Sequence, residues 1–144
     1  MIHEIASIDI NSPVEKVFDF MSDPRNRTRY DPDLIEVRQT PQPPMVVGTR
    51  IVEVRGMLGI QREMVTEVSE LEQNQLIAYR TLERDPTNAF GSYRFDSIPE
   101  GTRLTLDFTL DPKGITGLFA PLMARGLKRD IQSGLENIKA VLEV

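Results

Sequence analysis

The chain has 144 residues and carries 17 Lys and Arg against 22 Asp and Glu, which gives a net charge of −5. A domain of this length buries roughly 70% of the surface of its unfolded chain, so we expect one domain over residues 1–144 with a sizeable core. The acidic balance and the lack of a basic run argue against nucleic acid as a partner. Cysteine is absent, which excludes disulfides and thiolate metal ligands.

The N-terminal residues 1–5 lack the charged start and apolar core of a signal peptide. No apolar stretch approaches the roughly 18 to 20 residues that span a bilayer. The sequence therefore predicts a soluble, cytoplasmic protein.

The start of the chain predicts a strand followed by a helix. Residues 2–10 alternate between apolar and polar side chains, apart from Ile5, as a half-buried strand does. Ser12 then precedes Pro13, and Glu15 follows three residues after Ser12. This spacing is typical of a capping box, with Ser12 as the N-cap and Pro13 in the first turn.

A second capping signal, Asp23-Pro24, predicts another short helix that ends near Arg29. From Leu34 onward the hydrophobic period becomes two, which is typical of strands. The short turns between these segments favour antiparallel hairpins, because parallel crossovers need many more residues. With 2–10 as the first of seven, the predicted strands are 34–40, 49–58, 60–71, 75–83, 88–97 and 102–111.

The segment Leu122–Leu142 predicts a long amphipathic helix that covers the apolar face of the sheet. Its apolar arc includes Gly134, although glycine inside a helix costs up to about 1 kcal/mol relative to alanine. Gly134 either opens cavity volume or lets the helix approach the sheet closely, and we favour the close approach. The remaining arc comprises Met123, Leu127, Ile131, Leu135, Ile138, Val141 and Leu142.

Several of these segments together resemble the START-like (SRPBCC) superfamily, which includes polyketide cyclases, lipid-transfer domains and birch-pollen-allergen-like proteins. The resemblance rests on Ser12-Pro13 with its helix, Ser22-Asp23-Pro24, Arg29-Tyr30-Asp31-Pro32-Asp33, Val47-Gly48-Thr49 and Gly101-Thr102-Arg103-Leu104-Thr105. It covers essentially the whole chain, although many relatives carry Trp at the position of Tyr30. The resemblance implies an α+β helix-grip fold, in which a seven-stranded curved antiparallel sheet wraps around a long C-terminal helix. Two short helices join the first two strands, and an apolar cavity separates the sheet from the long helix.

The sequence offers little catalytic chemistry. His3 is the single histidine and lies near the terminus, where an exposed strand residue is the simpler interpretation. The chain has no nucleophile motif, no phosphate-binding glycine loop and no metal-ligand spacing. We therefore expect no metal and no cofactor, and the catalytic residues are unknown.

Apolar side chains occur where turns are expected to be polar. Met57, Leu58 and Ile60 surround one predicted hairpin tip. The connection before the long helix contains Ile115, Leu118 and Phe119. In the resembled family both segments rim the cavity. We hypothesise that they form an apolar mouth for ligand entry, or a weak contact with a membrane or a protein partner. The alternative, that they pack on each other, is about equally supported.

The polar candidates are the tyrosines, whose hydroxyls suit an apolar wall that holds a ligand. Strand parity does not decide whether Tyr79 or Arg80 faces inward, and a buried Arg80 would need an anionic partner such as a ligand carboxylate. The predicted cavity wall or mouth comprises Tyr30, Met57, Leu58, Met64, Tyr79, Arg80, Phe90, Tyr93, Phe95, Leu106, Phe108, Phe119, Met123, Leu127 and Gly134.

Three functions fit these features. The first hypothesis is binding or carriage of a lipid-like or polyketide-like hydrophobic molecule by a monomer or homodimer. The second is a polyketide cyclase, aromatase or dehydratase, and the third is a protein-interaction module. A buried cavity carboxylate with a raised pKa would favour the enzyme, whereas an all-apolar lining would favour the carrier. Because the sequence reveals no acid-base pair, the non-catalytic hypothesis comes first.

Overall fold

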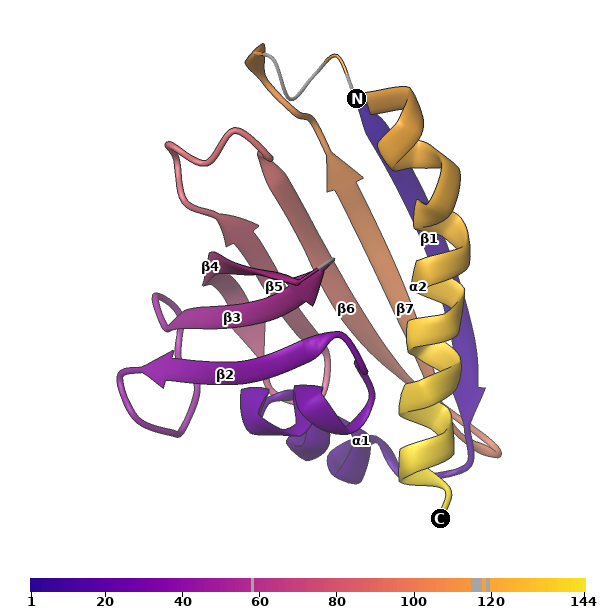
Figure 1. Cartoon of the computed structure of the whole chain (residues 1–144). Helices are drawn as coiled ribbons and strands as arrows, with labels where there is room; N and C mark the ends of the chain where they lie inside the picture. The colour runs from indigo at the N-terminus through magenta and orange to yellow at the C-terminus, as the bar shows by residue number, and fades with distance from the viewer. Residues whose placement is uncertain (58, 115–117, 119) are drawn as a thin grey trace.

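A computed structural model describes residues 1–57, 59–114, 118 and 120–144, without the side chains of Met57, Ala120 and Met123. Seven antiparallel strands form one curved sheet in the order β1-β7-β6-β5-β4-β3-β2, and α2 runs beside β1 (Figure 1). The elements are β1 (Ile2–Ile10), α1 (Val14–Met21), η1 (Pro24–Arg29), β2 (Leu34–Thr40), β3 (Arg50–Met57), β4 (Ile60–Glu72), β5 (Leu76–Thr81), β6 (Ala89–Ile98), β7 (Gly101–Leu110) and α2 (Ala120–Leu142). The predicted helix-grip fold is confirmed.

The turn that leads into β7 requires glycine at its last position. Gly101 begins β7 with φ +147, a conformation that side chains rarely adopt. A Cβ at this position would overlap the carbonyl oxygen of Ile10 and the backbone of Ser12. The chain can therefore pass closely under the end of β1 only with glycine here.

The predicted capping box at Ser12 is wrong. Pro13, with φ −65 and ψ 152, directly precedes the first helical residue, and no side chain caps α1. The Ser12 hydroxyl is buried without a hydrogen-bond partner among the described residues. Thr102 Oγ1 instead donates to the Ser12 carbonyl over 2.8 Å, so the start of β7 fixes the backbone before it can cap the helix. By contrast, Asp23 caps η1 by accepting a hydrogen bond from the Arg25 amide over 3.1 Å.

The core lies between the sheet and the second half of α2, where α1 closes the end of the sheet (Figure 1). Phe18 of α1 meets Phe95 of β6 edge to face, with 5.2 Å between ring centroids. The predicted apolar arc of α2 is confirmed where its side chains are described. Its buried members are Ile131, Leu135, Ile138 and Leu142.

Substituting Ser12 with Ala tests the observed helix start. A true N-cap would lose about 0.5–2 kcal/mol of stability. We expect no loss in this variant, because the hydroxyl is buried and makes no hydrogen bond that Ala would remove. Asp23→Ala is the matched control and is expected to lose about 1 kcal/mol, since this cap is present. Urea unfolding measures both, and a loss of about 1 kcal/mol for Ser12→Ala contradicts the structure.

Candidate functional site

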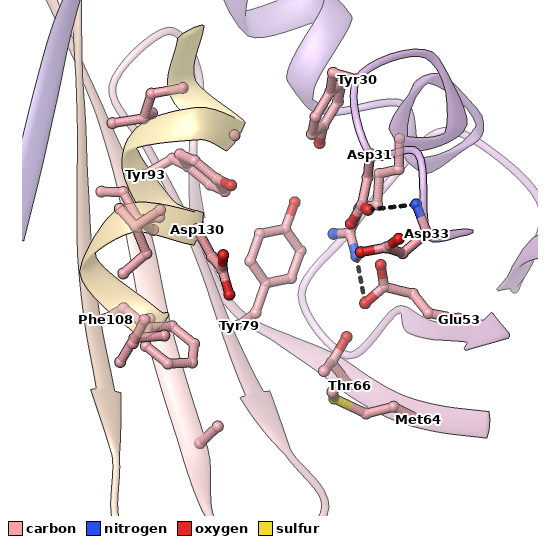
Figure 2. Close-up of a pocket in the computed structure, with 18 of the residues that line it drawn as sticks. Tyr30, Asp31, Asp33, Glu53, Met64, Thr66, Tyr79, Tyr93, Phe108 and Asp130 are labelled. Carbon is pink, nitrogen blue, oxygen red and sulfur yellow. Dashed lines mark hydrogen bonds and ion pairs between the residues drawn. The ribbon is translucent and has the colours of Figure 1, made fainter. Parts of the chain in front are cut away.

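A pocket of about 660 Å³ lies between the inner face of the sheet, α2 and the segment around η1 (Figure 2). Leu106 and Phe108 of β7 line it from the sheet, and Leu127 and Gly134 line it from α2. These residues form its apolar part. Leu106 and Phe108 are two residues apart and both line the pocket, which agrees with the hydrophobic period of two predicted for residues 102–111.

The opposite side of the pocket carries buried charge. Glu53 of β3 and Arg27 of η1 have side chains only 9% and 13% exposed, and Arg27 Nη1 lies 3.4 Å from Glu53 Oε1. Arg55, also on β3, lies 3.4 Å from Glu53 and 2.8 Å from the carboxylate of Asp31. Two cations and two anions are thus paired at this polar end, and Asp33 and Asp130 add further carboxylates to the pocket lining.

Three tyrosines separate the apolar and polar parts. Figure 2 shows the hydroxyls of Tyr30, Tyr79 and Tyr93 pointing into the same region of the pocket. The rings of Tyr79 and Tyr93 meet edge to face at 6.5 Å. The guanidinium carbon of Arg27 lies 4.8 Å from the centroid of the Tyr79 ring, within the range of a cation–π contact.

Burial fixes the protonation states of these groups. Burial raises the pKa of Tyr93 to about 12, and it also raises the pKa of Tyr30 and the pKa of Tyr79. The nearby cation of Arg27 opposes each of these shifts. Burial alone would lower the pKa of Arg27, but Tyr79 and Glu53 outweigh it and hold that pKa above its ordinary value. At neutral pH the tyrosine cluster therefore presents the permanent cation of Arg27 and three neutral phenols that can donate hydrogen bonds.

Most of the predicted cavity residues line this pocket, whereas Phe95 does not. Phe95 is only 3% exposed and belongs to the core. Arg80 and Phe90 border the pocket, but their side chains turn outward, and Arg80 pairs with Glu67. Of the two neighbouring residues on β5, Tyr79 therefore faces inward and Arg80 faces outward. The residues that line the pocket as predicted are Tyr30, Met64, Tyr79, Tyr93, Leu106, Phe108, Leu127 and Gly134.

The predicted apolar mouth stays a prediction. Leu58, Ile115 and Phe119 lie outside the described residues, as do the side chains of Met57 and Met123. Ile60 and Leu118 are 65% and 78% exposed.

Our preferred interpretation of Gly134 is wrong. A Cβ built on this residue would meet no atom within 4 Å, so the helix does not approach the sheet closely there. Gly134 instead leaves open space on the pocket wall. The helix therefore lacks a side chain at an arc position that faces the cavity.

Sequence reasoning missed the charged end. Glu53 and Arg55 follow buried Ile51 at intervals of two residues along β3, so all three lie on the same face of the strand. Charged residues on a face that also carries a buried isoleucine were the signal available in the sequence. Arg27 gave no such signal, because its position depends on the irregular path of η1. Among the described residues no group of three potential ligand side chains is placed to hold a metal ion. None of the described helices has the length and hydropathy of a membrane span.

The tyrosine environment predicts the alkaline behaviour of the protein. The chain has three tyrosines and no tryptophan, so phenolate absorbance reports this site alone. We expect no tyrosine to titrate near pH 10, with Tyr93 ionising near pH 12. Because the folded-state pKa lies above the unfolded value of 10.0, the stabilisation is complete below about pH 10 and is lost as the pH rises toward 12. A tyrosine that titrates at or below its ordinary value contradicts the burial.

Comparisons with known proteins agree with this architecture. The family model for "Polyketide cyclase / dehydrase and lipid transport" matches residues 1–143. The chain is similar in structure to TTHA0849 from Thermus thermophilus, with 19% identity, a TM-score of 0.77 and coverage of 98% and 95% of the two chains. The Zhui aromatase/cyclase from Streptomyces sp. R1128 also gives 19% identity and a TM-score of 0.77, with coverage of 98% and 93%. The structure of Ara h 8.0201 gives 11% identity and a TM-score of 0.75, with coverage of 97% of this chain and 96% of that chain.

These likenesses at low identity show the helix-grip fold. No curated protein sequence matches the chain. The family match covers nearly every residue, and the chain therefore belongs to the polyketide cyclase/dehydrase and lipid transport family.

Proposed function

We propose that this protein binds and carries a hydrophobic small molecule, lipid-like or polyketide-like, that has an apolar body and an oxygen-bearing end. The observation that supports this most directly is the two-part lining of the pocket. Leu106, Phe108 and Leu127 offer apolar surface on one side, whereas Arg27 and the phenols lie on the other. The volume of about 660 Å³ is in the usual range for small-molecule sites.

The polar end selects the chemistry of the bound group. Tyr30 and Tyr93 are neutral at physiological pH, and their hydroxyls make no hydrogen bond to any described residue. Arg27 adds N–H donors beyond its 3.4 Å ion pair with Glu53. Such a surplus of donors suits an acceptor such as a carbonyl or hydroxyl oxygen. A full carboxylate is less suitable, because Glu53 and Asp31 already neutralise the two cations nearby.

The same polar end supports a second candidate, an enzyme of the cyclase or dehydratase kind. Arg27 and the phenols would stabilise negative charge on a carbonyl oxygen, and the adjacent carboxylate of Glu53 would accept a proton from the neighbouring carbon. A carboxylate in the lining, which an all-apolar container would lack, is the observation that supports this candidate. Asp31, Asp33 and Asp130 also line the pocket. Glu53, however, is already held in ion pairs with Arg27 and Arg55, so carriage remains our first proposal.

Substituting Gly134 with Leu tests whether the pocket is the binding site. The new side chain enters open space on the wall, so the fold is retained while the cavity shrinks. We expect the affinity for the neutral fluorescent probe N-phenylnaphthylamine to fall about tenfold or more, which corresponds to about 1.4 kcal/mol. Gly126→Leu is the matched control, because Gly126 lies on the same helix outside the pocket wall. Unchanged probe binding in a folded Gly134→Leu protein contradicts the proposal.

Substituting Arg27 with Gln tests the polar end. We compare acetylnaphthalene with ethylnaphthalene, which differ by one carbonyl oxygen. The variant is expected to lose about 10- to 100-fold in affinity for the ketone, as for a charge-assisted hydrogen bond, and little for the hydrocarbon. Arg80→Gln is the matched control, because the Arg80 side chain is 60% exposed and pairs with Glu67. An equal effect on both ligands contradicts the assignment of Arg27.

Two additions keep that comparison interpretable. The double variant Arg27→Gln with Glu53→Gln removes both charges, so a buried unpaired carboxylate cannot explain the result. Deuterium exchange into the methyl group of bound acetylnaphthalene, followed by NMR, separates the two candidate functions. Accelerated exchange that Glu53→Gln abolishes supports the enzyme, and exchange at the uncatalysed rate supports the carrier.

A further inference from the structure

The free edge of β1 is covered along only part of its length. β1 and β2 are the two edges of the sheet, and β2 is protected by η1, which packs against it, and by Pro41, which follows it. On β1, Lys139 Nζ donates to the Asp9 carbonyl over 2.6 Å, and Glu143 accepts from the Asn11 amide over 2.8 Å. These two side chains thus cover the C-terminal end of β1, which lies beside the C-terminal end of α2 (Figure 1).

The first half of the same edge is open. Within an antiparallel strand, both backbone groups of alternate residues point to the same side. Since the Asp9 carbonyl points away from β7, the N–H and C=O groups of His3, Ile5 and Ser7 also point away from it. No described residue makes a hydrogen bond to these groups. Ile5 is 57% exposed here, so the open edge also offers an apolar side chain.

A basic groove of about 710 Å³ runs beside this open edge. Its floor includes residues 4–6 of β1, with the carboxylate of Glu4. Its wall on α2 carries Arg125, Lys128 and Arg129 and one carboxylate, Glu136, so the cations of the lining outnumber the anions. All three cations are exposed, and none forms an ion pair with a residue that the structure describes. The local positive charge contrasts with the net charge of −5 for the whole chain.

We propose that the open half of β1 binds an extended acidic segment of another protein, which adds to the sheet as an eighth strand. Backbone hydrogen bonds to residues 3, 5 and 7 would give the affinity, as in β-strand addition. Alternate acidic side chains of the segment would face Arg125, Lys128 and Arg129, and β-branched side chains between them would lie beside Ile5. A second copy of the chain fits less well, because each copy would bring the same three cations to the shared edge.

The probe is a fluorescein-labelled peptide of alternating Glu and Val, seven residues long, measured by fluorescence anisotropy. We expect binding to the wild-type protein that weakens as salt rises, because the charges are exposed. The Ile5→Pro variant loses an N–H group that points away from β7, but it keeps every hydrogen bond between β1 and β7. We expect it to bind the peptide at least tenfold more weakly. Ile5→Thr is the matched control and keeps that N–H group.

Charge is tested separately from backbone pairing. The double variant Lys128→Gln with Arg129→Gln is expected to weaken binding about tenfold, whereas Lys16→Gln, on the exposed face of α1, has no effect. The same peptide N-methylated at alternate residues should not bind, which tests pairing without altering the protein. The proposal is overturned if the peptide does not bind, if N-methylation and Ile5→Pro leave binding unchanged, or if sedimentation finds a dimer of the chain that Ile5→Pro abolishes.

Discussion

The carboxylate of Glu53 lies in the interior, and the arrangement of the pocket depends on neutralising it. An isolated buried carboxylate is unfavourable by several kcal/mol, so guanidinium groups must stay within reach. Arg55 comes from the same strand, but Arg27 comes from η1 and Asp31 from the turn that follows it. These ion pairs therefore fasten η1 and its turn to β3. They also hold Arg27 over the Tyr79 ring, inside the cavity.

The long helix α2 both fills the core and borders the pocket. Leu135, Ile138 and Leu142 of its second half belong to the core, whereas Leu127 and Gly134 leave room for the cavity. A hydrogen bond of 3.0 Å from the Asn137 side chain to the Tyr30 carbonyl joins the helix to the segment after η1. The packed end fixes the position of the helix, and this allows the rest of it to border a cavity without collapsing into it.

The pocket and the basic groove lie on two sides of α2. Ile131 and Ser133 border both, so the helix is a wall between a mostly apolar interior and a positively charged surface. The two sites differ in chemistry, because one presents neutral donors around a buried cation and the other presents exposed cations beside free backbone groups. A small apolar molecule and an acidic segment would therefore not compete for the same site.

Sequence patterns alone determined the order of the elements, the antiparallel sheet and the inward faces of β7 and α2. These are local properties, since a period of two or 3.6 residues depends only on near neighbours in the chain. The same reasoning failed at Ser12, because the backbone there is held by Thr102, which is 90 residues away. A capping signal predicts a helix start but not a competing contact from another strand.

Only the tertiary structure decided what the pocket can bind. Tyr30, Tyr79 and Tyr93 were visible in the sequence as candidates, but their convergence on Arg27 depends on where η1 crosses the sheet. Parity could not choose between Tyr79 and Arg80, and glycine at position 134 allowed two opposite interpretations. In each case the side chain or the space that matters is defined by elements distant in sequence. Local periodicity therefore fixes which elements form, and long-range packing and charge neutralisation fix the chemistry between them.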